Sequence, residues 1–104
     1  MENLTFTLAA APAAAGTRAL AIVGVVASGN LEVLVERTAD RDRCTVEIAT
    51  SAPGFGAVWE AVVTDFVARG TGGLRISIND GGARPDMVAL RLAQGLRLIA
   101  EPEA

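Results

Sequence analysis

The chain has 104 residues, of which 51% are hydrophobic and 20% are charged, and its formal net charge is −3. This length suits a single domain, and the high apolar content excludes an intrinsically disordered chain. The positive charges are all Arg and form no basic run, which argues against nucleic-acid binding.

The residue types that are missing restrict the chemistry. The chain has no His and no Tyr, and its nine positive charges include no Lys. A Ser-His-Asp or Cys-His nucleophile therefore cannot be assembled, and the commonest general base near neutral pH is absent. The single cysteine, Cys44, allows no intramolecular disulfide and no thiolate zinc site, and we expect it to be buried and inert. These absences predict a carrier, binding or structural role.

The N-terminus and the apolar runs bear on location. The chain starts with Met1 and the acidic Glu2, without the basic region of a secretory signal. No apolar run reaches the roughly 20 residues that a membrane-spanning helix needs. We therefore expect a cytoplasmic protein outside the membrane.

The first half of the chain predicts three strands. Residues 4–8 alternate apolar and polar side chains, which is the strand period. Residues 18–27 are a continuous apolar run, which predicts a strand buried on both faces, with a buried helix as the alternative. Ser28-Gly29-Asn30 is a tight turn, because Gly and Asn tolerate positive φ. Residues 31–37 follow as a strand, so Ser28 is expected near the tip of a β-hairpin.

The second half predicts two more strands and two helices. Residues 44–49 and 74–79 alternate as strands, and Asp80-Gly81-Gly82 is a turn signal. Residues 57–69 form a helix, and a second helix begins at Pro85. The predicted apolar stripes are Phe55, Trp59, Val62 and Phe66 for the first helix, and Val88, Leu92, Leu96 and Ile99 for the second.

The resulting order is β-β-β-β-α-β-α. Strands come first and helices come late, which favours the α+β class. We expect a mainly antiparallel sheet of about five strands with the two helices packed on one face. Residues 1–104 are expected to form one domain, with a flexible tail from about residue 100.

Ser28 is the candidate functional residue. By local sequence it is an ordinary turn serine. A hairpin tip, however, exposes its hydroxyl to a modifying enzyme, and Gly29 has no side chain to obstruct the approach. Without a His in the chain the hydroxyl has no internal base, so we expect an acceptor for modification and not a catalytic nucleophile.

Four segments carry a family resemblance. They are residues 1–6, residues 27–34 around Ser28, residues 78–83 and residues 88–92. In this order they resemble the acyl carrier (delta) subunit of bacterial malonate decarboxylase, over about residues 1 to 99. A related but shorter pattern, Ser-Gly-Asp followed by alternating apolar residues, occurs in the citrate lyase acyl carrier chain, which the segment around Ser28 also resembles. Asn30 stands where Asp is usual, which removes a charge and keeps the turn preference.

The resemblance implies a non-catalytic carrier with a covalent prosthetic group. Ser28 would hold 2′-(5″-phosphoribosyl)-3′-dephospho-coenzyme A through a phosphodiester, with Gly29 and Asn30 beside it. The terminal thiol would carry acetyl, which malonate displaces to give a malonyl thioester and free acetate. The implied partners are the acyl transferase (alpha) subunit, the beta and gamma carboxy-lyase subunits, the holo-carrier synthase and a malonyl transferase.

Two further readings stay open. The segment from Asp80 to Gly82 is expected to be an ordinary strand-to-helix turn, but Arg84 beside it is a candidate contact for a phosphate of the arm. The alternatives to the malonate decarboxylase carrier are a citrate lyase-type carrier and an unmodified protein-interaction domain.

Overall fold

Residues 1–102, which the computed structural model describes, form five strands and two helices in the predicted order. The strands are β1 (Glu2–Ala9), β2 (Leu20–Gly24), β3 (Leu31–Arg37), β4 (Arg43–Thr50) and β5 (Leu74–Asp80). The helices are α1 (Gly56–Val67) and α2 (Pro85–Ala100). The predicted α+β class is confirmed.

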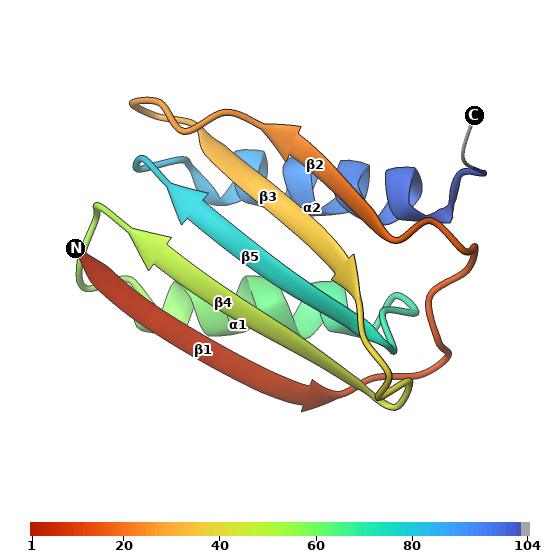
Figure 1. Cartoon of the computed structure of the whole chain (residues 1–104). Coiled ribbons are helices and arrows are strands. Elements are labelled where there is room, and N and C mark those ends of the chain that lie inside the picture. The colour runs from red at the N-terminus through yellow and green to blue at the C-terminus, as the bar shows by residue number, and fades with distance from the viewer. Residues whose placement is uncertain (103–104) are drawn as a thin grey trace.

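The strands form one sheet in the order β1-β4-β5-β3-β2. Neighbouring strands are antiparallel except β4 and β5, which are parallel. The parallel pair arises because α1 connects β4 to β5 and returns the chain to the same end of the sheet, as a crossover helix does. Both helices lie behind the sheet in the view of Figure 1, so they cover one face, as predicted.

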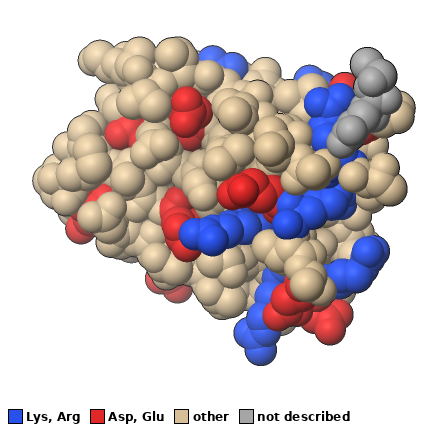
Figure 2. All heavy atoms as spheres, viewed as in Figure 1, with Lys and Arg blue, Asp and Glu red and all other residues tan. Residues whose placement is uncertain are grey.

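The two faces of the sheet differ in polarity. Val33 and Val35 on β3 and Ile76 on β5 point toward the helices and are fully buried. The opposite face has no helix over it in the described residues, and charged side chains of both signs lie on it (Figure 2). There Arg75 donates to the Glu47 carboxylate at 2.8 Å. Polar and apolar residues thus alternate along the strands because helices cover only one face of the sheet.

Strand β2 corrects one prediction. The apolar run of residues 18–27 was expected to be buried on both faces, but only Leu20–Gly24 is a strand, and it lies at the edge of the sheet. Ala21 and Val23 face the helices and are buried, whereas Leu20 and Ile22 are 52% and 57% exposed. The reason is that helices cover only one face of this sheet.

The helix stripes are shifted relative to the prediction. In α1, Trp59 and Phe66 are buried, but Phe55 precedes the helix as its N-cap and is exposed. In α2, Gly95 is buried against the sheet, whereas Leu96, which was predicted for this stripe, is half-buried. A β-carbon at Gly95 would lie 2.9 Å from Cγ2 of Val35, so the absence of a side chain lets α2 approach β3 closely.

Three connections meet at one end of the sheet, at the left of Figure 1. The register places Asp80 beside Leu31 on one side and beside Thr50 on the other. The β2–β3 hairpin, the β4–α1 loop and the β5–α2 loop therefore lie together. A flexible tail was predicted from about residue 100. Residues 103–104 of this C-terminal tail lie outside the described residues.

Candidate functional site

Ser28 lies in the turn that connects β2 to β3, and its side chain is exposed. The hairpin is closed by the Val25 N–H, which donates to the Leu31 carbonyl at 3.0 Å, and by the Asn30 N–H, which donates to the Ala27 carbonyl at 3.0 Å. Among residues 1–102 no hydrogen bond involves the Ser28 hydroxyl. The hydroxyl is therefore free to react with a molecule from outside.

The two residues after Ser28 shape the turn. Gly29 has a φ of +73°, a conformation that a residue with a β-carbon rarely adopts, although a β-carbon there would meet no neighbouring atom. Asn30 accepts a hydrogen bond from the Leu31 N–H through Oδ1 at 2.8 Å. An Asp at position 30 has the same acceptor, so the exchange of Asp for Asn keeps this contact.

The turn packs directly on the β5–α2 loop. The Gly29 N–H donates to the Gly81 carbonyl at 2.9 Å, and the Gly81 N–H donates to the Asn30 carbonyl at 2.8 Å. A β-carbon at Gly81 would collide with the Ala27 carbonyl oxygen. Only a glycine therefore lets the two loops approach this closely, and the contact braces the backbone that carries Ser28.

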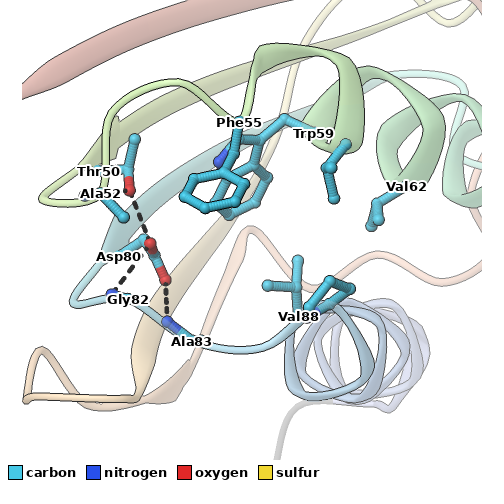
Figure 3. Close-up of a pocket in the computed structure, with 11 residues that line it drawn as sticks. Thr50, Ala52, Phe55, Trp59, Val62, Asp80, Gly82, Ala83 and Val88 are labelled. Carbon is cyan, nitrogen blue, oxygen red and sulfur yellow. Dashed lines mark hydrogen bonds between the residues drawn. The ribbon is translucent and has the colours of Figure 1, made fainter.

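Asp80 holds the β5–α2 loop in place. Its side chain is 5% exposed and accepts hydrogen bonds from the Thr50 hydroxyl at 2.7 Å, the Gly82 N–H at 3.1 Å and the Ala83 N–H at 2.9 Å (Figure 3). The carboxylate thus links β4, β5 and the start of α2. Its bonding is structural, and it is not directed at Ser28.

A cavity of about 230 Å³ opens at the same end of the molecule. It lies between α1 and the β5–α2 loop, with Phe55 and Trp59 on one side and Ala83 and Val88 on the other (Figure 3). Its lining is mostly apolar, and Asp80 is the only charged residue that residues 1–102 contribute to it. A concave apolar site with few polar groups is typical of small-molecule binding.

The sequence and the fold match one family. Residues 18–99 match the family model of the malonate decarboxylase delta subunit (MdcD). The chain is 60% identical over 102 residues to the malonate decarboxylase acyl carrier protein of Bradyrhizobium diazoefficiens, covering 97% of each chain. It is 52% identical over 101 residues to the protein of that name from Burkholderia cepacia, covering 96% of this chain and 92% of the relative.

This chain belongs to the malonate decarboxylase delta-subunit family.

A solved structure agrees with this assignment. The fold is similar to a chain in the crystal structure of a Pseudomonas malonate decarboxylase hetero-tetramer in complex with malonate. The TM-score is 0.83 with 36% sequence identity, and the match covers 95% of this chain and 99% of the Pseudomonas chain. The resemblance inferred from four short segments is thus confirmed over nearly the whole chain.

Membership in the delta-subunit family makes this chain a carrier subunit and not a catalytic one. The chemistry around Ser28 agrees, because residues 19–31 contain no ionisable side chain. The nearby carboxylate of Asp80 is buried and already accepts three hydrogen bonds. Ser28 therefore has no base to activate it as a nucleophile.

Arg84, the predicted phosphate contact, precedes α2 as its N-cap residue. Its side chain is exposed and lies 3.5 Å from the Asp86 carboxylate. It follows the loop that contacts the Ser28 hairpin, so it lies at the same end of the molecule as Ser28. Its role stays a prediction.

The bracing role of Gly81 and Asp80 was missed at the sequence level. The segment from Asp80 to Gly82 indicated only an ordinary turn. The signal in the sequence was the pair of glycines after an Asp at a strand end, but the partner of that turn is about 50 residues earlier in the chain.

In residues 1–102 no three carboxylate or thiol side chains come together in a group that could hold a metal ion. Neither α1 nor α2, the helices of that part of the chain, has the length and apolar content to cross a membrane.

Proposed function

We propose that Ser28 of this acyl carrier subunit holds 2′-(5″-phosphoribosyl)-3′-dephospho-coenzyme A through a phosphodiester on its hydroxyl. The observation that supports this is the exposed and unbonded Ser28 hydroxyl, at the tip of a hairpin braced by Gly81. When bound, the arm would supply a thiol that carries acetyl and malonyl groups as thioesters.

The residues around Ser28 fit such a group. A phosphodiester is anionic, and no carboxylate lies within residues 19–31 to repel it. Gly29 leaves open space beside the hydroxyl, where a modifying transferase approaches. The Asn30 side chain accepts a hydrogen bond from the backbone, so it keeps the turn closed while Ser28 carries the prosthetic group.

The carrier's own contribution is tethering. The whole chain would act as one cytoplasmic domain that presents the arm from Ser28 to an acyl transferase (alpha) subunit and then to beta and gamma carboxy-lyase subunits. A holo-carrier synthase would attach the arm, and a malonyl transferase would be a further partner. Tethering replaces diffusion by an effective concentration in the millimolar range, which explains why the carrier needs no catalytic side chain.

The deciding experiment is intact-mass analysis of protein purified from a host that contains the modifying enzymes. The wild type is expected to gain the mass of the phosphoribosyl-dephospho-coenzyme A group, and Ser28→Ala to keep the mass of the bare chain. Ser51→Ala is the matched control, because Ser51 is an exposed serine at the same end of the sheet. It should be modified like the wild type.

Two results would contradict the proposal. A bare-chain mass for the wild type would favour an unmodified interaction domain, and modification of Ser28→Ala would move the attachment to another residue. A citrate lyase-type carrier would accept citrate in place of malonate once modified. Because the carrier has no catalytic side chain, acetyl exchange is assayed with the acyl transferase subunit of each system added, with malonate for one and citrate for the other, and we expect exchange only in the malonate system.

A further inference from the structure

The cavity between α1 and the β5–α2 loop has an exposed aromatic wall. Phe55 is 53% exposed although its ring lines the cavity, and Trp59, which is 6% exposed, lies one helical turn further on. The backbone N–H of Trp59 donates to the Phe55 carbonyl at 2.9 Å, which fixes the start of α1. Figure 3 shows both rings at the cavity, facing the β5–α2 loop and α2. An open aromatic wall of this kind suits stacking with a flat ring.

The cavity lies close to Ser28. Gly29, the residue after Ser28, is hydrogen-bonded to Gly81, and Gly82, the residue after Gly81, lines the cavity. The path through these bonds limits the distance between the Cα atoms of Ser28 and Gly82 to about 10 Å. A group joined to Ser28 by a short linker can therefore reach the cavity.

The charge of the cavity lining determines which part of an arm attached to Ser28 can bind there. Among the described residues of the lining, Asp80 alone is charged, and it is buried. Its carboxylate disfavours anions, which excludes the diphosphate and a malonyl carboxylate. Three of its roughly four acceptor positions are used, so one remains for an N–H donor. A neutral aromatic ring with an exocyclic amine fits both the apolar wall and this acceptor.

We propose that the cavity binds the adenine base of the arm attached to Ser28, an inference that rests on the proposed function. In that arm the phosphoribosyl group joins Ser28 to the adenosine ribose, so adenine is nearer to the protein than the thiol. Stacking on Phe55 and Trp59 anchors the base and leaves the pantetheine end outside the cavity. Because tethering supplies an effective concentration in the millimolar range, even a millimolar affinity keeps the base bound about half of the time.

The test uses the unmodified protein and soluble pieces of the arm. Trp59 is the only tryptophan, so its indole N–H gives a single resonance in an NMR spectrum. Adenosine and 3′-dephospho-coenzyme A are expected to shift this resonance with millimolar affinity, and pantetheine is expected to leave it in place. An unmoved resonance with adenosine, or an equal shift with pantetheine, would overturn the proposal.

Variants separate the cavity from other surfaces. Phe55→Ala removes an exposed stacking ring and should weaken adenosine binding about tenfold. Ala83→Leu should also weaken it, by filling the cavity. Leu90→Ala, which removes an exposed apolar side chain of α2 outside the cavity, is the control and should bind like the wild type. Equal binding by all three variants would contradict the assignment.

The modified protein completes the test. Once intact mass shows that Ser28 carries the arm, the Trp59 resonance of the modified protein should lie at the position reached with saturating adenosine. A resonance at the unmodified position would refute adenine binding while Ser28 modification stands. A chain that never gains the mass but binds adenosine would refute the proposed function and leave a free nucleoside site.

Discussion

Gly81 donates its backbone N–H to the carbonyl oxygen of Asn30 at 2.8 Å and so joins the β5–α2 loop to the turn that carries Ser28. The two residues are distant in the sequence, and the contact depends on a position where no β-carbon fits.

Gly81→Ala should destabilise the protein by about 1–3 kcal/mol, because the new methyl group collides with the Ala27 carbonyl and forces the two loops apart. Urea unfolding measures this change. Gly56→Ala is the control, since Gly56 begins α1, has no positive φ and has open space around its Cα. A Gly81→Ala protein as stable as Gly56→Ala would show that the loops are not braced by this contact.

Thr50→Val should lower the free energy of unfolding by about 1–3 kcal/mol, because it removes a donor from the buried Asp80 carboxylate. The substitution keeps the side-chain shape, so the loss reports on this hydrogen bond together with the one that the Thr50 hydroxyl accepts from the Ala52 N–H at 3.1 Å. Thermal unfolding compares it with Thr5→Val, a change at an exposed position on edge strand β1. We expect Thr5→Val to be nearly neutral, and equal losses in both variants would argue against a special role for Thr50.

Cys44 should make stability depend on alkaline pH. It is fully buried, and burial raises the pKa of its thiol, an effect that a hydrogen bond with Thr71 partly opposes. Because the folded pKa is raised, this contribution to stability is fully present below the unfolded value, about 8.5, and is lost as the pH rises through the folded pKa.

Comparison of the wild type with Cys44→Val across this range measures the Cys44 effect. The difference in unfolding free energy should stay constant below about pH 8.5 and move against the wild type above it. Iodoacetamide should modify the native thiol much more slowly than the urea-unfolded thiol. Parallel pH profiles together with rapid native alkylation would contradict the buried, inert thiol that was predicted from the sequence.

Arg37→Lys should destabilise the protein by about 1.5–3 kcal/mol. The Arg37 guanidinium donates to the carbonyls of Arg18, Ala14, Ala15 and Ile99 at 2.6 to 3.2 Å, and it thereby joins the β1–β2 connection to the C-terminal turn of α2. A Lys ammonium keeps the charge but cannot reproduce this planar fork of donors.

Arg75→Lys is the control for Arg37→Lys. Arg75 pairs with Glu47 on the open sheet face, where both side chains are more than 40% exposed and the pair is screened by solvent. Chemical unfolding of the two variants should show a clear loss for Arg37→Lys and a change within about 0.5 kcal/mol for Arg75→Lys. A reversed order would be inconsistent with the four carbonyl contacts.

Arg84→Ala should slow attachment of the arm to Ser28 about fivefold if Arg84 contacts a phosphate, because an exposed charge pair contributes about 1 kcal/mol. The rate of mass gain with the modifying enzyme measures this effect. Arg97→Ala, in the last turn of α2, is the matched control at the other end of the helix. Arm attachment and use at the wild-type rate in Arg84→Ala would remove Arg84 from the site.

The periodicity of apolar residues predicted the helices and strands, but it did not predict which of their faces are buried. The alternating residues of β3, β4 and β5 predicted the strands, because one face of each is covered by helices and the other is not. The apolar run before Ser28 was misjudged for the same reason. Its side chains suit burial on both faces, but β2 lies at an edge and only one face is covered, so Leu20 and Ile22 are exposed.

The candidate site likewise has features that the local sequence determines and features that depend on the tertiary structure. Ser28-Gly29-Asn30 is a turn by local chemistry, since positive φ at Gly29 and the Asn30 side chain bond are properties of adjacent residues. The sequence by itself therefore determined an exposed serine at a hairpin tip, in a chain without a general base.

Only the tertiary structure decided what surrounds that serine. The contact between Gly29 and Gly81, and the cavity beside Gly82, exist because β5 pairs with β3 on one side and runs parallel to β4 on the other. Strand order and direction depend on contacts between residues far apart in the chain, and the period of a single strand carries no information about them.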